Sequence, residues 1–189
     1  MSYFPAFLNL NTKQILILGG GAIAYSKLVH LLDFTKNIHI IAQGFCDEML
    51  GLIEEKSISY QQKTYNLGDI KEYDIVIIAI DDIVLAKEIY EESKGYKCLC
   101  NSVDSLEHCD FTFASYIKQG DLTLAISTNG SSPAFTKQLK IYLESILPKD
   151  MGEFLQEMKE LRATLPKGKE RMNMLKDRAK NYIKSWRRI

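Results

Sequence analysis

Short unbroken apolar runs alternate with stretches of helical spacing along the first hundred residues. The runs at 14–18, 38–42, 75–80 and 97–101 are typical of strands buried in a parallel sheet. Between these runs, apolar residues recur every three or four positions, which is the spacing of a helix with one buried face. Because parallel strands need helical crossovers, the alternation predicts an α/β fold built on a doubly wound parallel sheet.

The rest of this region follows the same alternation. We expect helices at 47–56 and 83–94 and a weak strand at 58–60. Asp81-Asp82 precedes the second of these helices as a cap, and Gly95 is expected to end it, since glycine readily adopts the left-handed conformation that follows many helices.

The pattern changes after residue 101. Two extended runs, 111–117 and 122–127, predict a hairpin. A helix should follow, with Ser132 as its cap and Pro133 at its first position. Beyond residue 148, two amphipathic segments predict two further helices. The sequence thus separates into an α/β region, a hairpin-plus-helix region and a helical end.

A glycine cluster lies between the first expected strand and its helix. The run Gly19-Gly20-Gly21-Ala22-Ile23-Ala24 fits the form G-x-G-x-x-G/A of dinucleotide-binding folds. Gly19 would permit a tight turn, Gly21 a close approach of the backbone to a diphosphate, and Ala24 a close contact of helix with strand. An ordinary strand-to-helix turn could also carry three glycines, but the strand–turn–helix context favours a phosphate site at the helix start.

The end of the second expected strand bears on which dinucleotide binds. Folds of this type often place an acidic residue there to hold the ribose 2′-hydroxyl, whereas this sequence has Gln43-Gly44. Gln43 can still bond a ribose hydroxyl, and no arginine or lysine is adjacent in the sequence to attract a 2′-phosphate. We therefore expect NAD in preference to NADP.

Charge and composition exclude several classes of protein. The 24 Lys and Arg residues balance the 24 Asp and Glu residues, so no chain-wide bias favours nucleic acid or anionic membranes. The start of the chain lacks the pattern of a secretory signal, and no apolar run approaches a membrane span. We therefore expect a cytoplasmic protein with reduced cysteines. His108 beside Cys109 does not have metal-site spacing, so no resident metal is expected.

Five segments occur in an order that resembles the precorrin-2 dehydrogenase family, including the dehydrogenase/chelatase portion of siroheme synthase. They are Phe4-Pro5-Ala6-Phe7-Leu8, the glycine cluster with Ala24, Ala79 with Asp81-Asp82, Asn101-Ser102-Val103-Asp104, and the run from Ala125 to Pro133. Each segment is ordinary by itself, but the five together in register are specific. The resemblance runs from residue 3 to about residue 150.

The resemblance implies a domain plan and an activity. It implies an NAD-binding Rossmann domain at 1–110, a small dimerisation region at 111–148 and a helical C-terminal domain at 149–189, in a homodimer. The implied reaction is the NAD-dependent oxidation of precorrin-2 to sirohydrochlorin, on the way to siroheme or cobalamin. Bifunctional members of the family also insert a metal, so Fe²⁺ or Co²⁺ would be a transient substrate.

The resemblance also assigns site residues. The fingerprint already gives Gly19 and Gly21 as cofactor residues, and the resemblance adds contacts to the backbone at Ala22 and Ile23 and to the segment Gln43-Gly44. Asp104 matches the family's catalytic aspartate. Asn101, in the same motif, is a candidate substrate-binding residue, although an Asn at this place can also simply form a turn.

A carboxylate beside the ring suits the loss of a proton that accompanies hydride removal, although a lone Asp after a strand can also simply cap a turn. Hydroxyls, an amide and backbone N–H groups at a helix start make the run from Thr128 through Asn129 and Gly130 to Ser131 a candidate rim for the substrate's carboxylates. The C-terminal residues 151–189 carry 11 basic against 5 acidic residues and could help, although a solvated helical face would look the same.

Two other functions fit the same residues. One is a regulatory module that senses NAD(H) without turnover and uses its basic end to contact a partner. The other is a dehydrogenase that keeps the cofactor but acts on a different small ligand.

Overall fold

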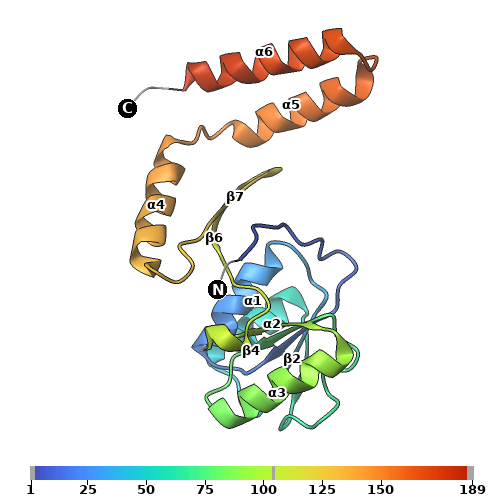
Figure 1. Ribbon diagram of the computed structural model, residues 1–189, viewed down its shortest axis with the longest axis vertical. Coiled ribbons are helices and arrows are strands. Elements are labelled where there is room, and N and C mark those ends of the chain that lie inside the picture. The colour runs from blue at the N-terminus through green and yellow to red at the C-terminus, as the bar shows by residue number, and fades with distance from the viewer. Residues whose placement is uncertain (1–2, 104, 187–189) are drawn as a thin grey trace. The chain divides into compact units, whose positions relative to one another are not determined.

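The computed structural model describes residues 3–103 and 105–186, which form two compact units (Figure 1). The first unit comprises Tyr3–Thr112, and the second begins at Phe113. The hairpin, the helix after it and the C-terminal helices, which the sequence analysis separates into two regions, therefore belong to one compact unit.

The first unit is a five-stranded parallel sheet with helices on both faces. The strands stand in the order β3-β2-β1-β4-β5, which is the order of the first five strands of a Rossmann fold. In Figure 1, α1 and α2 lie on one side of this sheet and α3 on the other. The predicted doubly wound α/β fold is thereby confirmed. The elements are β1 (Ile15–Leu18), α1 (Ala22–Leu32), β2 (Ile38–Ala42), α2 (Asp47–Lys56), β3 (Ser59–Gln62), β4 (Ile75–Ile78), α3 (Ile83–Tyr96), β5 (Leu99–Ser102) and the 3₁₀ turn η1 (Leu106–His108).

The core lies around the two central strands. Every residue of β1 and β4 is buried, because helices cover both faces of the sheet at this point. Leu28 of α1, Met49 of α2 and Ile89 of α3 are fully buried against the sheet. The edge strand β3 differs in that all four of its residues are exposed. Its polar composition explains why the sequence pattern indicates only a weak strand there.

Several boundaries differ from the sequence-based predictions by one to four residues, and two of these differences have an identifiable cause. The prediction that Gly95 ends α3 is wrong, because the helix continues to Tyr96 and Lys97 takes the left-handed conformation with φ 57°. The first strand of the predicted hairpin begins at Ser115 rather than at residue 111. The segment before it is held instead by Asn101, whose side-chain amide Nδ2 donates to the carbonyl oxygen of Phe111 at 2.8 Å.

The second unit consists of a two-stranded antiparallel hairpin and three helices. The turn of the hairpin contains Gly120 with φ 57°, a left-handed conformation that suits glycine. Ser132 caps α4 as predicted, since its Oγ accepts from the N–H of Phe135 at 3.2 Å, and Pro133 is the first helical residue. The elements are β6 (Ser115–Gln119), β7 (Leu122–Ile126), α4 (Pro133–Ile146), α5 (Met151–Thr164) and α6 (Lys169–Ser185).

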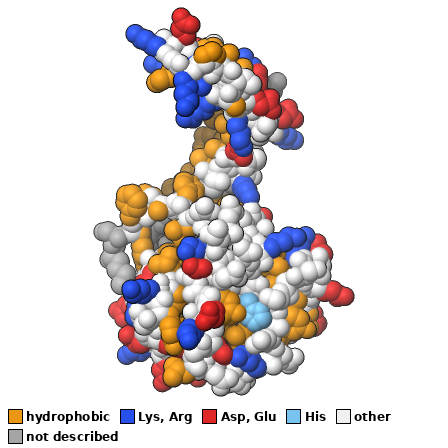
Figure 2. Space-filling view, turned by 90° about the vertical axis from the view of Figure 1, so that its right-hand side faces the viewer, with side chains coloured by type: hydrophobic (Ala, Val, Ile, Leu, Met, Phe, Trp, Pro, Cys, Tyr) orange, Lys and Arg blue, Asp and Glu red, His pale blue; other side chains and the backbone are white. Residues whose placement is uncertain are grey.

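The last two helices pair with little buried surface. The rings of Phe154 and Tyr182 stack with their centroids 3.8 Å apart, and the Tyr182 hydroxyl donates to Asp150 at 2.8 Å. Acidic and basic side chains are interspersed over this end of the molecule (Figure 2). Met151 is the one buried residue that the structure describes in α5 and α6. Within the described part of the chain, no helix has both the length and the apolar composition needed to span a bilayer.

Stability should depend far more on the first unit's sheet than on the C-terminal helices. Ile40 is fully buried in β2, whereas Ile183 of α6 is 59% exposed. We expect Ile40→Ala to lower the free energy of unfolding by about 2–5 kcal/mol, because it leaves a cavity. The matched control Ile183→Ala should change it by less than about 0.5 kcal/mol. Denaturant unfolding measures both, and equal effects would contradict this description of the core.

Candidate cofactor site

A cavity of about 500 Å³ lies at the carboxyl edge of the sheet in the first unit. It is centred on the loops that follow β1, β2 and β4, so it includes the point where the strand order reverses between β1 and β4. Open α/β sheets bind their ligands at this point. The cavity is lined by Leu18, Gly19, Gly20, Gly21, Ala22, Ile23, Ile41, Ala42, Gln43, Gly44, Lys63, Tyr65, Ala79, Ile80, Asp81, Asp82, Leu85, Ile89 and Val103.

Gly19 forms the turn out of β1 in a conformation that favours glycine. Its φ is +123°, and a Cβ atom placed on it would lie 2.0 Å from the carbonyl oxygen of Ala79. The N–H of Ala79 donates to the Leu18 carbonyl at 2.8 Å, which draws the loop after β4 against the turn. No larger residue fits at position 19 without displacing that loop.

Gly20 packs in the same way against the loop that follows β2. A Cβ on Gly20 would lie 2.0 Å from the carbonyl oxygen of Gly44, and the Gly20 carbonyl accepts from the N–H of Cys46 at 2.8 Å. The sequence pattern predicts no role for Gly20, because the residues it contacts are about two dozen positions away in the chain. Gly20 therefore positions Gln43-Gly44 beside the glycine turn.

Gly21 is the exception among the three glycines. It precedes α1 in an extended conformation, and a Cβ built on it meets no atom within 4 Å. No side chain caps the helix, and its first turn carries no acidic residue. Open space in front of an uncapped helix N-terminus is the arrangement that accepts a diphosphate, so these residues fit a dinucleotide.

The loops after β2 and β3 form another part of the lining. Gln43 and Gly44, which the resemblance assigns to the cofactor, line the cavity, and the Gln43 carbonyl accepts from the side chain of Gln62 at 3.0 Å. Lys63 and Tyr65, which the sequence analysis does not single out, line the cavity as well. The predicted strand at 58–60 ends two residues before β3 does. Lys63 therefore did not stand out from the sequence as the residue that directly follows a strand, at the edge of the sheet where ligands bind.

Two acidic groups have structural partners. Asp82 caps α3 as predicted, since its Oδ1 accepts from the N–H of Leu85 at 3.0 Å. Glu92 accepts from the Tyr65 hydroxyl and from the N–H of Gly68. Burial, together with the bond to Glu92, raises the pKa of Tyr65 above its usual range. Tyr65 therefore stays neutral and serves to fix the cavity wall.

Asn101 lies at the end of β5 but outside the cavity lining. It is 5% exposed, and its Nδ2 donates to the Phe111 carbonyl, as described above, and to the Cys109 sulfur at 3.5 Å. The Cys109 sulfur in turn lies 3.1 Å from the carbonyl oxygen of Ser102. Asn101 thus holds the chain that returns past the end of β5. Asp104, the predicted catalytic residue, lies outside the described residues.

The predicted substrate residues at positions 128–131 belong to the second unit. They form the turn before α4, in which Asn129 and Gly130 have positive φ. The N–H of Ser131 donates to the Thr128 carbonyl at 3.0 Å, and the N–H of Asn129 to Ser127 Oγ at 3.1 Å. These two N–H groups are engaged within the turn, so a ligand would meet mainly side chains here.

The described residues contain no group of three or more His, Cys, Asp and Glu side chains that could hold a metal ion. All four cysteines are free thiols, three of them buried. Burial raises the pKa of the Cys100 thiol to about 12.

The contrast between Gly20 and Gly21 separates folding from binding. Gly20→Ala should lower the free energy of unfolding by about 1–3 kcal/mol, because the new methyl group overlaps the Gly44 carbonyl. Gly21→Ala should cost at most about 1 kcal/mol, since the methyl group enters open space. The same methyl group should weaken dinucleotide binding by about tenfold or more. Thermal unfolding and calorimetric titration distinguish the two effects. Unchanged affinity in Gly21→Ala would mean that no diphosphate approaches this turn.

Comparison with known proteins agrees with this geometry. Residues 6–115 match the family described as "Putative NAD(P)-binding", and residues 119–145 match the one described as "Sirohaem biosynthesis protein central". The structure is similar to "SirC, precorrin-2 dehydrogenase", with a TM-score of 0.80, 23% sequence identity and coverage of 93% of this chain and 88% of that one. At this identity the similarity establishes the fold.

Two siroheme synthases are similar in sequence. The protein from Mannheimia succiniciproducens is 32% identical over 80% of this chain, and that from Ruthia magnifica is 32% identical over 94%. The chain spans only 32% and 37% of their respective lengths. The predicted resemblance to siroheme-forming proteins is confirmed. Because the first family match covers more than half of the chain and contains the glycine turn with its cavity, this chain belongs to the family described as "Putative NAD(P)-binding".

Proposed function

We propose that this chain oxidises precorrin-2 to sirohydrochlorin with NAD as the hydride acceptor. The observation that carries the proposal is the glycine turn. The first two glycines of this turn pack against backbone atoms of neighbouring loops, and the third faces open space. The chain is also similar to siroheme synthases over at least 80% of its length. A turn built only to connect a strand to a helix has no need of that space.

The chain's own groups account for cofactor binding. The backbone at Ala22 and Ile23 would hold the diphosphate, helped by the positive end of α1, and Gln43 would bond the ribose. When bound, NAD supplies the acceptor for the hydride that leaves the reduced ring.

The reaction also releases one proton for each hydride transferred, and a base must accept it. We assign this role to Asp104, whose carboxylate can take the proton as the new double bond forms. Val103, the residue before it in the chain, lines the cavity. Asn101 would act as a positioning residue, because it ties β5 to Cys109 and Phe111.

The carboxylates of the substrate need hydrogen-bond donors and positive charges. Among its described lining residues, the cavity of the first unit offers one basic side chain, Lys63. We assign the carboxylates to Thr128, Asn129, Gly130 and Ser131, with the basic residues of α5 and α6 as further candidates. Arg171 is the least suited of these, since its guanidinium donates to the carbonyls of Arg162 and Leu165 at 2.9 Å and so closes the turn between the helices.

Exposed apolar residues in the region from β6 to α4 support a homodimer. A two-stranded hairpin is only marginally stable by itself. Within this chain α4 has no fully buried residue among those described, and Phe135, Ile141 and Tyr142 are each more than half exposed. Apolar surface of this kind is typical of an interface, so we propose that the region from β6 to α4 associates with a second copy.

Iron insertion into sirohydrochlorin is a second activity that we propose for the same site. Metal insertion requires a base for the pyrrole protons, and Asp104 would serve in both reactions. Following the loss of sirohydrochlorin absorbance after addition of Fe²⁺ or Co²⁺ tests this step separately from dehydrogenation.

The dehydrogenase assay separates the proposal from its alternatives. Incubation with precorrin-2 and NAD should produce sirohydrochlorin absorbance together with equimolar NADH. Binding of NAD without turnover would favour a redox-sensing module. If the protein oxidises another reduced ligand but not precorrin-2, the tetrapyrrole is not its substrate. Absence of NAD binding would remove the proposal altogether.

The catalytic assignment has its own test. Asp104→Asn keeps the size of the side chain but removes the basic carboxylate, so the dehydrogenation rate should fall by about 100-fold or more. Calorimetry should show NAD affinity close to that of the parent protein, because no cofactor contact is assigned to Asp104. A full rate in this variant would show that another group accepts the proton.

A further inference from the structure

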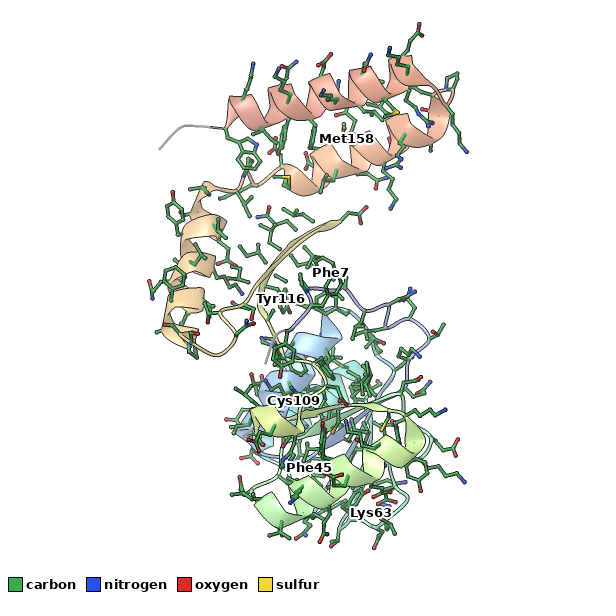
Figure 3. The ribbon with its side chains drawn as sticks, viewed as in Figure 1. Phe7, Phe45, Lys63, Cys109, Tyr116 and Met158 are labelled. Carbon is green, nitrogen blue, oxygen red and sulfur yellow. The ribbon has the colours of Figure 1, made fainter. Side chains whose placement is uncertain are left out.

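Lys63 introduces a positive charge at the ribose end of the cavity. It immediately follows β3, and its N–H donates to the Ala42 carbonyl at 2.9 Å, which places its backbone beside the end of β2 where Gln43 begins. Among the described residues that line the cavity, Lys63 is the only lysine or arginine. Figure 3 shows it in the same unit as Phe45, which belongs to the loop after β2.

The position of Lys63 bears on the choice between NAD and NADP. A cation near the end of the second strand is what such folds use to bind the 2′-phosphate of NADP. The absence of Lys or Arg near Gln43 in the sequence favours NAD, yet the fold brings a lysine to this place from the neighbouring strand. An unpaired lysine here would favour NADP.

Lys63 is not unpaired, however. Its Nζ lies 2.7 Å from Oδ1 of Asp69, and the Asp69 side chain is only 17% exposed. The other carboxylate oxygen of Asp69 accepts from the N–H of Asn66 at 2.9 Å, so the acid is held in place by its own loop. A phosphate that approached the ammonium group would have to compete with this carboxylate and would also be repelled by it.

We propose that the Lys63–Asp69 ion pair sets the nucleotide preference of the site. Asp69 neutralises the cation that could bind a 2′-phosphate, and the site therefore takes NAD in preference to NADP. This inference rests on the proposed function, because it concerns the cofactor of that reaction, and it locates the preference in the pair rather than in Gln43.

The test is calorimetric titration of the whole chain with NAD and with NADP. Asp69→Asn should release Lys63 while keeping an oxygen for the N–H of Asn66. The affinity for NADP should then rise about tenfold relative to that for NAD. The double variant Lys63→Met/Asp69→Asn should lose this gain. Adenosine 2′,5′-bisphosphate and adenosine 5′-monophosphate should reproduce the difference, because they report the adenosine end alone.

Asp74→Asn is the matched control. Asp74 forms an ion pair of the same 2.7 Å length with Lys13, but at the amino end of β4, away from the cavity. Its removal should leave the NADP-to-NAD ratio unchanged. If Asp69→Asn does not fold, Lys63→Met is the second variant. It leaves the Asp69 carboxylate without its cation, and the repulsion of a 2′-phosphate by this carboxylate should weaken NADP binding about tenfold relative to NAD binding.

Two results would overturn the inference while the proposed function stands. One is NAD binding with the same NADP-to-NAD ratio in the parent chain and in the folded Asp69 or Lys63 variant. The other is a gain for NADP that persists in the double variant. Failure of both dinucleotides to bind the parent chain would instead refute the proposed function, and this inference with it.

Discussion

The first unit depends on backbone packed directly against backbone at the end of β1. Gly19 lies against the carbonyl of Ala79 and Gly20 against the carbonyl of Gly44, so two loops from either side of the central strand close on one turn. Side chains cannot intervene at these contacts. The loops that follow β2 and β4 are thereby held at fixed positions around the mouth of the cavity, and the start of α1 is left facing it.

Local patterns predicted the fold and the part of the site that is contiguous in sequence. Unbroken apolar runs identify β1 and β4 because both faces of these strands are covered, and the fingerprint identifies the turn because its glycines are adjacent. Contacts between distant residues have no such signal. The packing of Gly20 on Gly44, the bond from Asn101 to Phe111 and the bond from the N–H of Lys63 to the Ala42 carbonyl all depend on which strands become neighbours.

Local conformational preferences also have limits. Glycine is favoured where a helix ends in a left-handed residue, yet Gly95 remains helical and Lys97 adopts that conformation instead. The strand β5 begins two residues later and pairs with β4 from Leu99 onward, so the sheet determines where the chain must turn. Tertiary contacts thus override the preference of a single residue.

The polarity of β3 has a consequence for how copies of this chain meet. A sheet that ends in an apolar strand offers its unpaired amides and carbonyls to any other chain, and such edges recruit additional strands. The outermost strand here is Ser59-Tyr60-Gln61-Gln62 with a lysine directly after it, and all four of its residues are exposed. A hydrated edge of this kind discourages another chain from adding a strand beside β3.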